Sequence, residues 1–521
     1  MTPAAATKPL SVPQSVVRGT AVLAGLQLLE QLTGFGSQSV VAALFGATAR
    51  TDAYFVACSV ISLLTIWFTV PVEQVAIPIF RHDLSRRGEA AAWQGASVLL
   101  CNLMVLASGV AAFAWCLAPH LVSVVGLGFD IQSKALATSL TRCLLVIVVM
   151  TVVADYLAQL LLSYERFALS GIAGIAENVV FAAVLFALGA TIGVYALAVA
   201  MLIAVAVHVV FRLPILWQHR ANISLRVDFR HHGMREMRRL GAPSLLSAAG
   251  MQAARVADRL FASLLSAGSI SALAFALLLI EIPNRLLLQP VQRATFPHFT
   301  RLISEENYDE FSRQLFQALR LLFFLAVPAT IGLMLVSDLI VRVAFQRGAF
   351  DETAVGLTSR AVFFYAIGLP ATFLSRMLDQ TFYSLKETRT PMLLTWIRIG
   401  SKILLMWILI PALALAGIAL AESLSQILRL CAYLCLLPSA IRREDAARTV
   451  AAFARTLAST AAMAVVMLLA KTSPEGTLAV TLHLAELVGM GLGSYLLASW
   501  VVQPAEMEWF GRSLLAVRGR T

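Results

Sequence analysis

The sequence predicts an all-α polytopic membrane protein with about fourteen transmembrane helices, built as two pseudo-repeated six-helix lobes plus two C-terminal helices. Hydrophobic residues make up 59% of the 521 residues and charged residues only 13%, about half the share usual in soluble domains. Apolar stretches of about 20 residues, long enough to cross ~30 Å of hydrocarbon, follow one another along the chain. Related segments also recur about 219 residues apart. Together these observations exclude a soluble globular domain.

Each apolar stretch is expected to be a helix, because backbone amides in lipid must be hydrogen-bonded within their own segment. The predicted spans are roughly 19–45, 53–80, 92–117, 139–163, 169–190, 192–214, 241–265, 269–296, 316–336, 354–377, 391–413, 415–438, 449–470 and 478–501. The predicted domain division places the first six spans in residues 1–220, the next six in 235–440 and the last two in 447–505.

The internal repeat is visible in several separate segments that keep a nearly constant offset. Residues 117–122, followed by Gly128-Phe129-Asp130, recur as residues 335–340, followed by Gly348-Ala349-Phe350-Asp351. Arg142 recurs as Arg360, and Thr51-Asp52-Ala53 matches Ile270-Ser271-Ala272 more weakly. Repeated halves of this size in a membrane are typical of alternating-access transporters, with the substrate path between the halves.

The net charge of +11 is a topology signal rather than a nucleic-acid surface. Lys and Arg fall in every second loop, roughly two dozen against about five in the intervening loops. By the positive-inside rule, both termini are predicted to be cytoplasmic, and no nucleic-acid partner is expected. The basic loops contain Arg81, Arg86 and Arg87; Arg220 to Arg239; Arg301 and Arg313; Lys386 and Arg389; Arg442, Arg443 and Arg448; and Arg512, Arg518 and Arg520.

No motif indicates an enzyme. The six cysteines lie within apolar segments, where buried thiols are favoured over a metal site or disulfide, so no metal or cofactor is expected. The Gly-rich run 489–493 lies inside the last predicted span and favours close helix packing over phosphate binding. Nothing resembles an ATPase or a catalytic triad, so a gradient or the substrate concentration must supply the energy.

Charged residues at membrane depth are the candidates for a functional site, because they are costly when they face lipid. Glu281 and Arg285 are spaced i, i+4 in one span, and Arg398 and Lys402 repeat that spacing in another. Asp52, Arg255, Asp258 and Arg259 lie in further spans. Any one of these residues could form a structural ion pair or lie near an interface. Taken together, they indicate a shared polar cavity.

Several motifs resemble the MurJ/MviN lipid II flippases of the MOP exporter superfamily. They are Gly34-Phe35, the runs 41–47 and 51–57, residues 261–265 with Gly268-Ser269-Ile270-Ser271, 345–350, Tyr365, Gly368-Leu369-Pro370, Phe382-Tyr383 and Thr388-Arg389-Thr390-Pro391. The resemblance covers about residues 20–440. It implies a two-lobed, fourteen-helix fold with a central cavity. It also implies that an undecaprenyl-diphosphate-linked sugar is flipped from the cytoplasmic to the outer leaflet of a bacterial inner membrane.

The chain departs from this family where the resemblance implies arginines that hold the diphosphate. The matching positions are Gln31, Ser37, Thr65 and Leu278, whereas the family's cavity acids survive as Asp52 and Glu281. Arg285 lies two helical turns from Leu278, and Arg255 and Arg259 lie one span away, so these three are candidate replacement cations. This pattern suggests a different substrate, or a different grip on the same one.

A second departure concerns coupling. The resemblance implies that some members bind sodium between an aspartate of the seventh span and two residues of the eleventh. The aspartate matches Asp258, whereas the other two positions are Lys402 and Met406. We expect the Lys402 ammonium to occupy the cation's place and to pair with Asp258, which would make transport sodium-independent. The alternative is that Lys402 extends to the cytoplasmic edge of the membrane.

The resulting hypothesis is a flippase for an undecaprenyl-diphosphate-linked saccharide, either lipid II-like or an exopolysaccharide precursor. Its partners would be this glycan, membrane lipids and glycan-synthesis proteins. The predicted substrate-binding residues are Arg255, Arg259, Arg285, Gln31, Ser37 and Thr65, and the predicted cavity or coupling residues are Asp52, Asp258, Glu281 and Lys402. Two alternatives remain open: a cation-coupled multidrug-type exporter, or a non-transporting scaffold for polysaccharide assembly.

Overall fold

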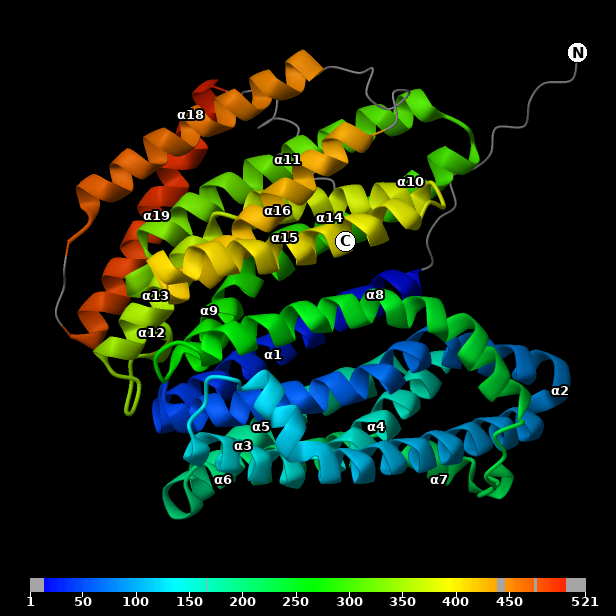
Figure 1. The fold of residues 1–521 in the computed structure, drawn as a ribbon. Helices are drawn as coiled ribbons and strands as arrows, with labels where there is room; N and C mark the ends of the chain where they lie inside the picture. Colours follow the sequence, from blue (N-terminus) through cyan, green and yellow to red (C-terminus); the bar gives the residue numbers. More distant parts are fainter. Residues whose placement is uncertain (1–13, 165, 438–445, 473–475, 503–521) are drawn as a thin grey trace, which may run out of the picture. The chain divides into compact units, whose positions relative to one another are not determined.

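The computed structural model describes residues 14–164, 166–437, 446–472 and 476–502, and every regular element in these ranges is a helix (Figure 1). Among these residues, ten helices are long and apolar enough to cross a membrane. The number is eleven if the bent pair Glu352–Ala366 and Leu369–Ser384 forms one span. The predicted class is confirmed, while the count of fourteen stays a prediction.

Each predicted span is helical over nearly all of its described length, although 139–163, 269–296 and 354–377 each cover two or three elements. The elements are α1 (Gln14–Phe45), α2 (Ala49–Val125), α3 (Ile131–Leu144), α4 (Val146–Ser163), α5 (Phe167–Ile192), α6 (Tyr195–Val210), α7 (Pro214–Gln218), η1 (Arg220–Asn222), α8 (His232–Ser263), α9 (Ser269–Pro283), the π-helical turn η2 (Asn284–Leu288), α10 (Gln289–Ser304), α11 (Tyr308–Leu335), α12 (Ser337–Phe345), α13 (Glu352–Ala366), α14 (Leu369–Ser384), α15 (Arg389–Leu413), α16 (Leu415–Leu436), α18 (Ala446–Ala470) and α19 (Thr477–Val502).

The long element α2 accounts for two predicted spans. Its 77 residues would extend about 115 Å as one straight helix, far more than a bilayer requires. Gly88 interrupts the helix with φ 81 and ψ 171, in a region of backbone conformation that essentially only glycine adopts. The predicted spans 53–80 and 92–117 lie on either side of this break.

The chain folds into two compact units. Unit 1 comprises Met1–Val41, Val60–Leu121 and Ala137–Ala248, and unit 2 comprises Ala42–Ser59, Val122–Leu136 and Ala249–Thr521. Helix α8 therefore contributes residues to both units.

The predicted division into 1–220, 235–440 and 447–505 follows the sequence repeat rather than compactness, and it stays a prediction. Its ends at residues 440 and 505 lie outside the described residues, as do the basic residues Arg442, Arg443, Arg512, Arg518 and Arg520.

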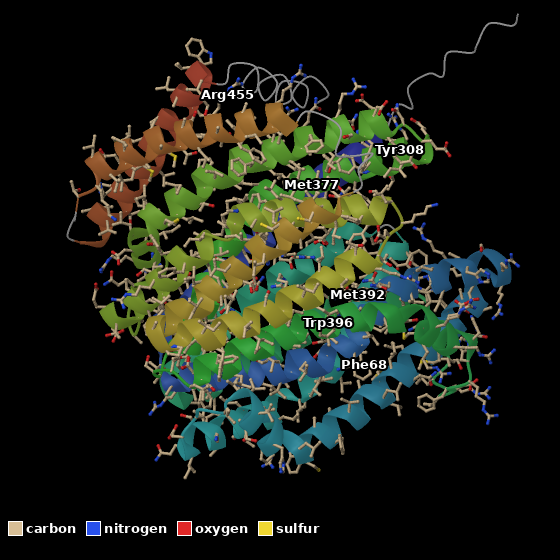
Figure 2. All side chains as sticks on the ribbon, turned by 45° about the horizontal axis from the view of Figure 1, so that its top comes forward. Phe68, Tyr308, Met377, Met392, Trp396 and Arg455 are labelled. Carbon is tan, nitrogen blue, oxygen red and sulfur yellow. The ribbon has the colours of Figure 1, made fainter. Side chains whose placement is uncertain are left out.

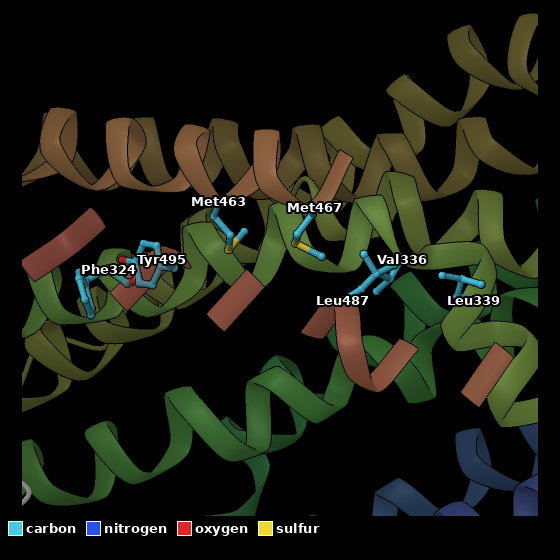
Figure 3. Close-up of a cluster of buried hydrophobic side chains, with 7 residues drawn as sticks. All are labelled: Phe324, Val336, Leu339, Met463, Met467, Leu487 and Tyr495. Carbon is cyan, nitrogen blue, oxygen red and sulfur yellow. Dashed lines mark hydrogen bonds between the residues drawn. The ribbon is translucent and has the colours of Figure 1, made fainter. Parts of the chain in front are cut away.

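Within unit 2, the last two helices, α18 and α19, pack against α11 and α12 through an apolar cluster (Figure 3). The Tyr495 hydroxyl on α19 donates a hydrogen bond of 2.7 Å to the carbonyl of Phe324 on α11. Gly491 also faces α18, because a Cβ there would lie 2.8 Å from Met467 Sδ. Gly491 is therefore a site of close helix packing. The cluster consists of Phe324, Val336, Leu339, Met463, Met467, Leu487 and Tyr495.

Two short segments from the first half of the chain are built into unit 2 by backbone contacts. The Ala349 N–H donates to the Ala43 carbonyl at 2.7 Å, and the Gly128 N–H donates to Ser263 Oγ at 3.1 Å. A Cβ at Gly348 would overlap the Ala43 carbonyl, and one at Gly128 would overlap the Ser263 carbonyl. By the repeat offset, Gly128 corresponds to Gly348, and Ala43 to the residue before Ser263. A close approach of a glycine to a backbone carbonyl is thus made twice with the halves exchanged, as in a two-fold interface, although the two hydrogen bonds differ in their acceptors.

Asp52 lies at the centre of this arrangement. Its Oδ1 accepts hydrogen bonds from both the N–H and the O–H of Ser271, and its Oδ2 accepts one from the Gly268 N–H, each at 2.7 Å. The buried carboxylate therefore caps the N-terminus of α9, where free amide groups and the helix dipole favour negative charge. Asp52 and Ser271 are themselves repeat-equivalent positions, so their contact marks the local pseudo-two-fold axis. We define the Asp52 cap and the two glycine contacts as the clasp.

We predict that Gly128→Ala and Gly348→Ala each loosen the clasp, because the added methyl group overlaps a backbone carbonyl that cannot rotate away. Thermal unfolding in detergent should show a loss of roughly 1–3 kcal/mol for each variant. A cysteine replacing the buried Ala53 should also become reactive toward a membrane-impermeant maleimide. Gly332→Ala and Gly356→Ala serve as controls, since their Cβ positions are open. An unchanged midpoint together with an unreactive cysteine would contradict the role of the glycines.

Candidate functional site

A buried ammonium group forms the centre of the candidate site. Lys402 on α15 lies 2.7 Å from Asp258 Oδ1 on α8 and 2.5 Å from Glu422 Oε2 on α16. Its side chain is only 4% exposed, so the ammonium group is enclosed by the protein. The expected pairing of Lys402 with Asp258 is present, and Glu422 is a second partner.

Arg398 completes the charge balance of the cluster. Its Nη1 donates to Glu422 Oε1 at 3.1 Å, and Gln426 Nε2 donates to the same oxygen at 2.9 Å. The cluster therefore holds two cations and two carboxylates. Such balance matters because an unpaired charge in a low-dielectric interior costs several kcal/mol. We define Asp258, Arg398, Lys402 and Glu422 as the charge cluster.

Helix geometry explains why these residues meet. Arg398 and Lys402 are spaced i, i+4 and lie on one face of α15, while Glu422 and Gln426 have the same spacing on α16. These two helices form a hairpin that turns at Ala414. Just before Arg398 in α15, Trp396 (labelled in Figure 2) lies against Gly250 of α8. A Cβ at Gly250 would be 3.2 Å from Trp396 Cζ2. This close approach of α8 to α15 brings Asp258 to Lys402.

A polar cavity of about 110 Å³ adjoins the charge cluster within unit 2. It has room for several water molecules. Two buried acceptors in its wall, Asn284 Oδ1 and Gln426 Oε1, have no hydrogen-bond partner among the described residues. Buried polar atoms are normally satisfied, so water or a ligand is expected here. Its polar lining includes Asp258, Glu281, Asn284, Thr372, Arg376, Lys402, Glu422 and Gln426.

Three of the predicted cavity residues, Asp258, Glu281 and Lys402, thus line one cavity, and Asp52 lies apart in the clasp. The predicted arginines do not line this cavity either. Arg285 is exposed and lies 3.9 Å from Glu281 at the expected i, i+4 spacing. Arg259 donates to the Phe55 carbonyl and lies over the Phe55 ring, with its guanidinium carbon 6.0 Å from the ring centroid. Arg255 is exposed.

The predicted polar positions of the first spans belong to unit 1, whereas the three arginines belong to unit 2. The Ser37 hydroxyl donates to the Gly34 carbonyl at 2.8 Å, and the Thr65 hydroxyl donates to the Ile61 carbonyl at 2.7 Å. Both hydroxyl hydrogens are therefore engaged within their own helix. Gln31 is half-buried on α1. A role of these three residues in substrate binding stays a prediction.

The sequence reasoning missed Glu422 and a second buried charge group nearby. Arg429 Nη2 on α16 donates to Asp379 Oδ1 on α14 at 2.7 Å, and the Tyr433 hydroxyl donates to the same oxygen. Glu422, Arg429 and Tyr433 are spaced i, i+7 and i+11, on one face of α16. Glu422 is the one acid in the apolar stretch 415–438. This position could have indicated a buried ion pair, because a charge in such a stretch needs a partner.

Comparison with known proteins identifies relatives along most of the chain. Residues 41–489 match the family model described as "Lipid II flippase MurJ". The chain is 26% identical over 424 residues to "Lipid II flippase MurJ" of Burkholderia cenocepacia, covering 78% of this chain and 81% of that protein. It is 25% identical over 443 residues to "Probable lipid II flippase MurJ" of Vibrio cholerae, covering 81% and 82%.

Solved structures show the same fold. The structure described as "Lipid II flippase MurJ, inward closed conformation" matches with a TM-score of 0.79 and 19% identity, covering 95% of this chain and 100% of that chain. An inward-facing multidrug resistance MATE family transporter of the MOP superfamily matches with a TM-score of 0.68 and 17% identity, covering 80% and 96%.

We predict that Lys402→Met strongly destabilises the protein, because it leaves Asp258 buried without its cation. The expected loss in free energy of unfolding is roughly 3–5 kcal/mol. The double variant Lys402→Met/Asp258→Asn should recover more than half of that loss, since Glu422 keeps Arg398. Thermal unfolding in detergent measures both effects, and Lys386→Met in an exposed loop is the control. A single variant as stable as the parent would show that the pairing contributes nothing.

Proposed function

We propose, from the premise that this chain belongs to the MurJ lipid II flippase family, that it moves an undecaprenyl-diphosphate-linked saccharide across the bacterial inner membrane. The observation that carries the proposal is the family match over residues 41–489, which covers both halves of the repeat. The chain is a multi-pass membrane transporter rather than an enzyme. The multidrug-type exporter is not favoured, since the MATE likeness is one of fold alone.

The clasp supports alternating access as the mode of transport. It joins segments of the first half, 42–59 and 122–136, to the second half through the Asp52 cap and the paired glycine contacts. A conformational change that separates these segments must break the hydrogen bonds of the clasp, and the reverse change must restore them. A substrate can drive such a change only if it binds the two states with different affinities.

The exposed arginines of unit 2 are the proposed anchors for the diphosphate. Arg255 and Arg285 lie at the surface of the unit, and the only ion pair described for Arg285 is the long one to Glu281. A planar guanidinium can donate two parallel hydrogen bonds to phosphate oxygens. Arg259, held by the Phe55 carbonyl, adds positive charge nearby along α8. Contact of the unit 1 residues Gln31, Ser37 and Thr65 with the substrate stays a prediction from the sequence.

The charge cluster supports a coupling mode without sodium. The Lys402 ammonium occupies the space between two carboxylates that a bound cation would otherwise neutralise. The protein therefore carries this positive charge as part of its own chain. We further propose that both termini are cytoplasmic and that glycan-synthesis proteins are partners. The first proposal rests on the bias of basic residues toward alternate loops.

We expect Arg255→Gln and Arg285→Gln each to lower translocation about tenfold, because each removes a charge-assisted contact to phosphate. The measurement is exposure of the lipid-linked glycan at the outer leaflet of the native host. The exposed Arg347→Gln is the matched control. Unchanged exposure in both variants would favour the scaffold alternative over transport.

A replacement experiment tests which saccharide is the cargo. The resident lipid II flippase of a bacterium is depleted, this chain is expressed, and its membrane level is confirmed. Growth and lipid II exposure together would identify lipid II as a cargo. If neither growth nor lipid II exposure is restored at a normal protein level, the proposed cargo is another lipid-linked glycan.

We predict that the parent protein is indifferent to sodium and that Lys402→Asn gains a sodium response. The substitution leaves two carboxylates and an amide oxygen around the vacated position, a donor set that suits a hard cation. The thermal midpoint in sodium chloride is compared with that in choline chloride at equal ionic strength. A sodium-dependent parent, or a variant without any response, would count against the proposal that the Lys402 ammonium takes the place of a bound cation.

A further inference from the structure

The connection between α6 and α8 is a separate feature that the transport proposal does not use. Residues 211–230, which we name the strap, include the short helix α7 and an extended stretch, and they lie within unit 1 (Figure 1). We propose that the strap is a binding surface for anionic phospholipid head groups of the cytoplasmic leaflet. This inference goes beyond the proposed function and does not depend on it.

The C-terminal part of the strap is fixed to α2 through its backbone. One side-chain amide, that of Asn102, accepts from the Asp228 N–H at 2.9 Å and donates to the Asp228 carbonyl at 2.7 Å. Four residues earlier, the Ser224 N–H donates to Ser97 Oγ at 2.9 Å. Since polar backbone groups hold the chain in place, the side chains between these points are free to face outward.

The N-terminal part is held by an aromatic stack. The His219 ring lies on the Trp93 ring with centroids 4.2 Å apart and planes inclined by 15°. Its Nε2 lies 3.1 Å from Glu89 Oε1, and Trp93 donates to the Tyr164 hydroxyl at 2.9 Å. The strap is therefore a fixed platform rather than a loose loop.

The outward face of this platform combines apolar side chains with arginines. Leu225 is 88% exposed, Trp217 73%, and Val227 and Phe229 are also exposed. Three arginines of the strap are exposed as well: Arg220, Arg226 and Arg230. From residue 220 to 239 the chain holds six arginines against two acids. Leaving such large apolar groups in water is unfavourable, so this face requires a partner that is both apolar and anionic.

The contacts with α2 place the strap at the level of the head groups. The chain carries no Asp, Glu, Lys or Arg from residue 90 to 129. The helical part of this stretch, residues 90–125, is about 54 Å long and exceeds the hydrocarbon thickness of ~30 Å. Arg226 lies between the two strap residues that are bonded to Ser97 and Asn102, and an arginine in hydrocarbon is costly. Residues 103–125 remain to span it, a length of about 34 Å.

The head-group layer of the basic, cytoplasmic side fits these constraints. Lipid phosphates accept hydrogen bonds from guanidinium groups, and the upper acyl chains receive Trp217, Leu225 and Phe229. Clusters of four to eight basic residues next to a membrane are typical sites for anionic lipid. A soluble acidic partner would match the arginines but would leave the apolar side chains without a nonpolar environment.

The test uses the purified full-length protein and phosphatidylglycerol as the probe. Binding is followed as the rise in thermal midpoint when phosphatidylglycerol, rather than phosphatidylcholine, is added in mixed micelles. For the triple variant Arg220→Gln/Arg226→Gln/Arg230→Gln we expect the affinity for phosphatidylglycerol to fall on the order of 100-fold. Each arginine near an anionic surface contributes roughly fivefold in affinity, and three are removed. The triple variant Arg301→Gln/Arg313→Gln/Arg389→Gln removes the same charge from exposed positions of unit 2 and should bind normally.

Two further arms separate lipid from other anions and binding from misfolding. Trp217→Ala/Leu225→Ser should weaken phosphatidylglycerol binding although it changes no charge, and free glycerol 3-phosphate should not compete. An unchanged midpoint in phosphatidylcholine shows that each variant is folded. Equal binding by the strap variant and the parent would overturn the proposal. Competition by glycerol 3-phosphate or by soluble polyglutamate would overturn it as well.

Discussion

Burial of the Lys402 ammonium is the constraint on which the arrangement of unit 2 depends. A charge this deep is tolerated only beside opposite charge, so α8 must supply Asp258 and α16 must supply Glu422. Arg398 then neutralises the second carboxylate. Three helices are thereby held in one register, and the cavity with its unsatisfied acceptors adjoins their meeting point. Packing, charge balance and the candidate coupling site follow from this single requirement.

The clasp consists of contacts between the two halves of the internal repeat. Repeat-equivalent positions, Asp52 and Ser271, meet each other, and the Gly128 and Gly348 contacts repeat one geometry with the halves exchanged. A contact across a two-fold axis is closed by both halves at once. The cap is asymmetric, because one half contributes a carboxylate and the other contributes the helix terminus that it caps. The cap is therefore held by the hydrogen bonds of one buried carboxylate, that of Asp52.

The two basic features of the chain have different physical roles. Arg255 and Arg259 of α8 and Arg285 of η2 lie within unit 2 and are proposed to bind a phosphate-bearing cargo. The arginines of the strap belong to unit 1 and accompany exposed apolar side chains. Helix α8 begins beside the strap in unit 1 and continues to Asp258 in unit 2. One helix therefore connects the surface proposed for lipid with the charge cluster.

Apolar length and self-similarity along the chain were sufficient to predict the helical membrane class and the internal repeat, because both are properties of the linear sequence. The pairing of Lys402 with Asp258 was expected from the resemblance to the flippase family, and the structure contains this ion pair. Only the tertiary structure revealed Glu422 as the second partner, the Asp379–Arg429 pair, and the clasp around Asp52. It also assigned the residues of α8 to two units and placed Asp52 apart from the cavity that Glu281 lines. These features depend on which helix faces which, and on backbone-to-backbone distances. Neither hydropathy nor spacing along one chain specifies such distances, because helix packing is set by contacts between segments far apart in sequence.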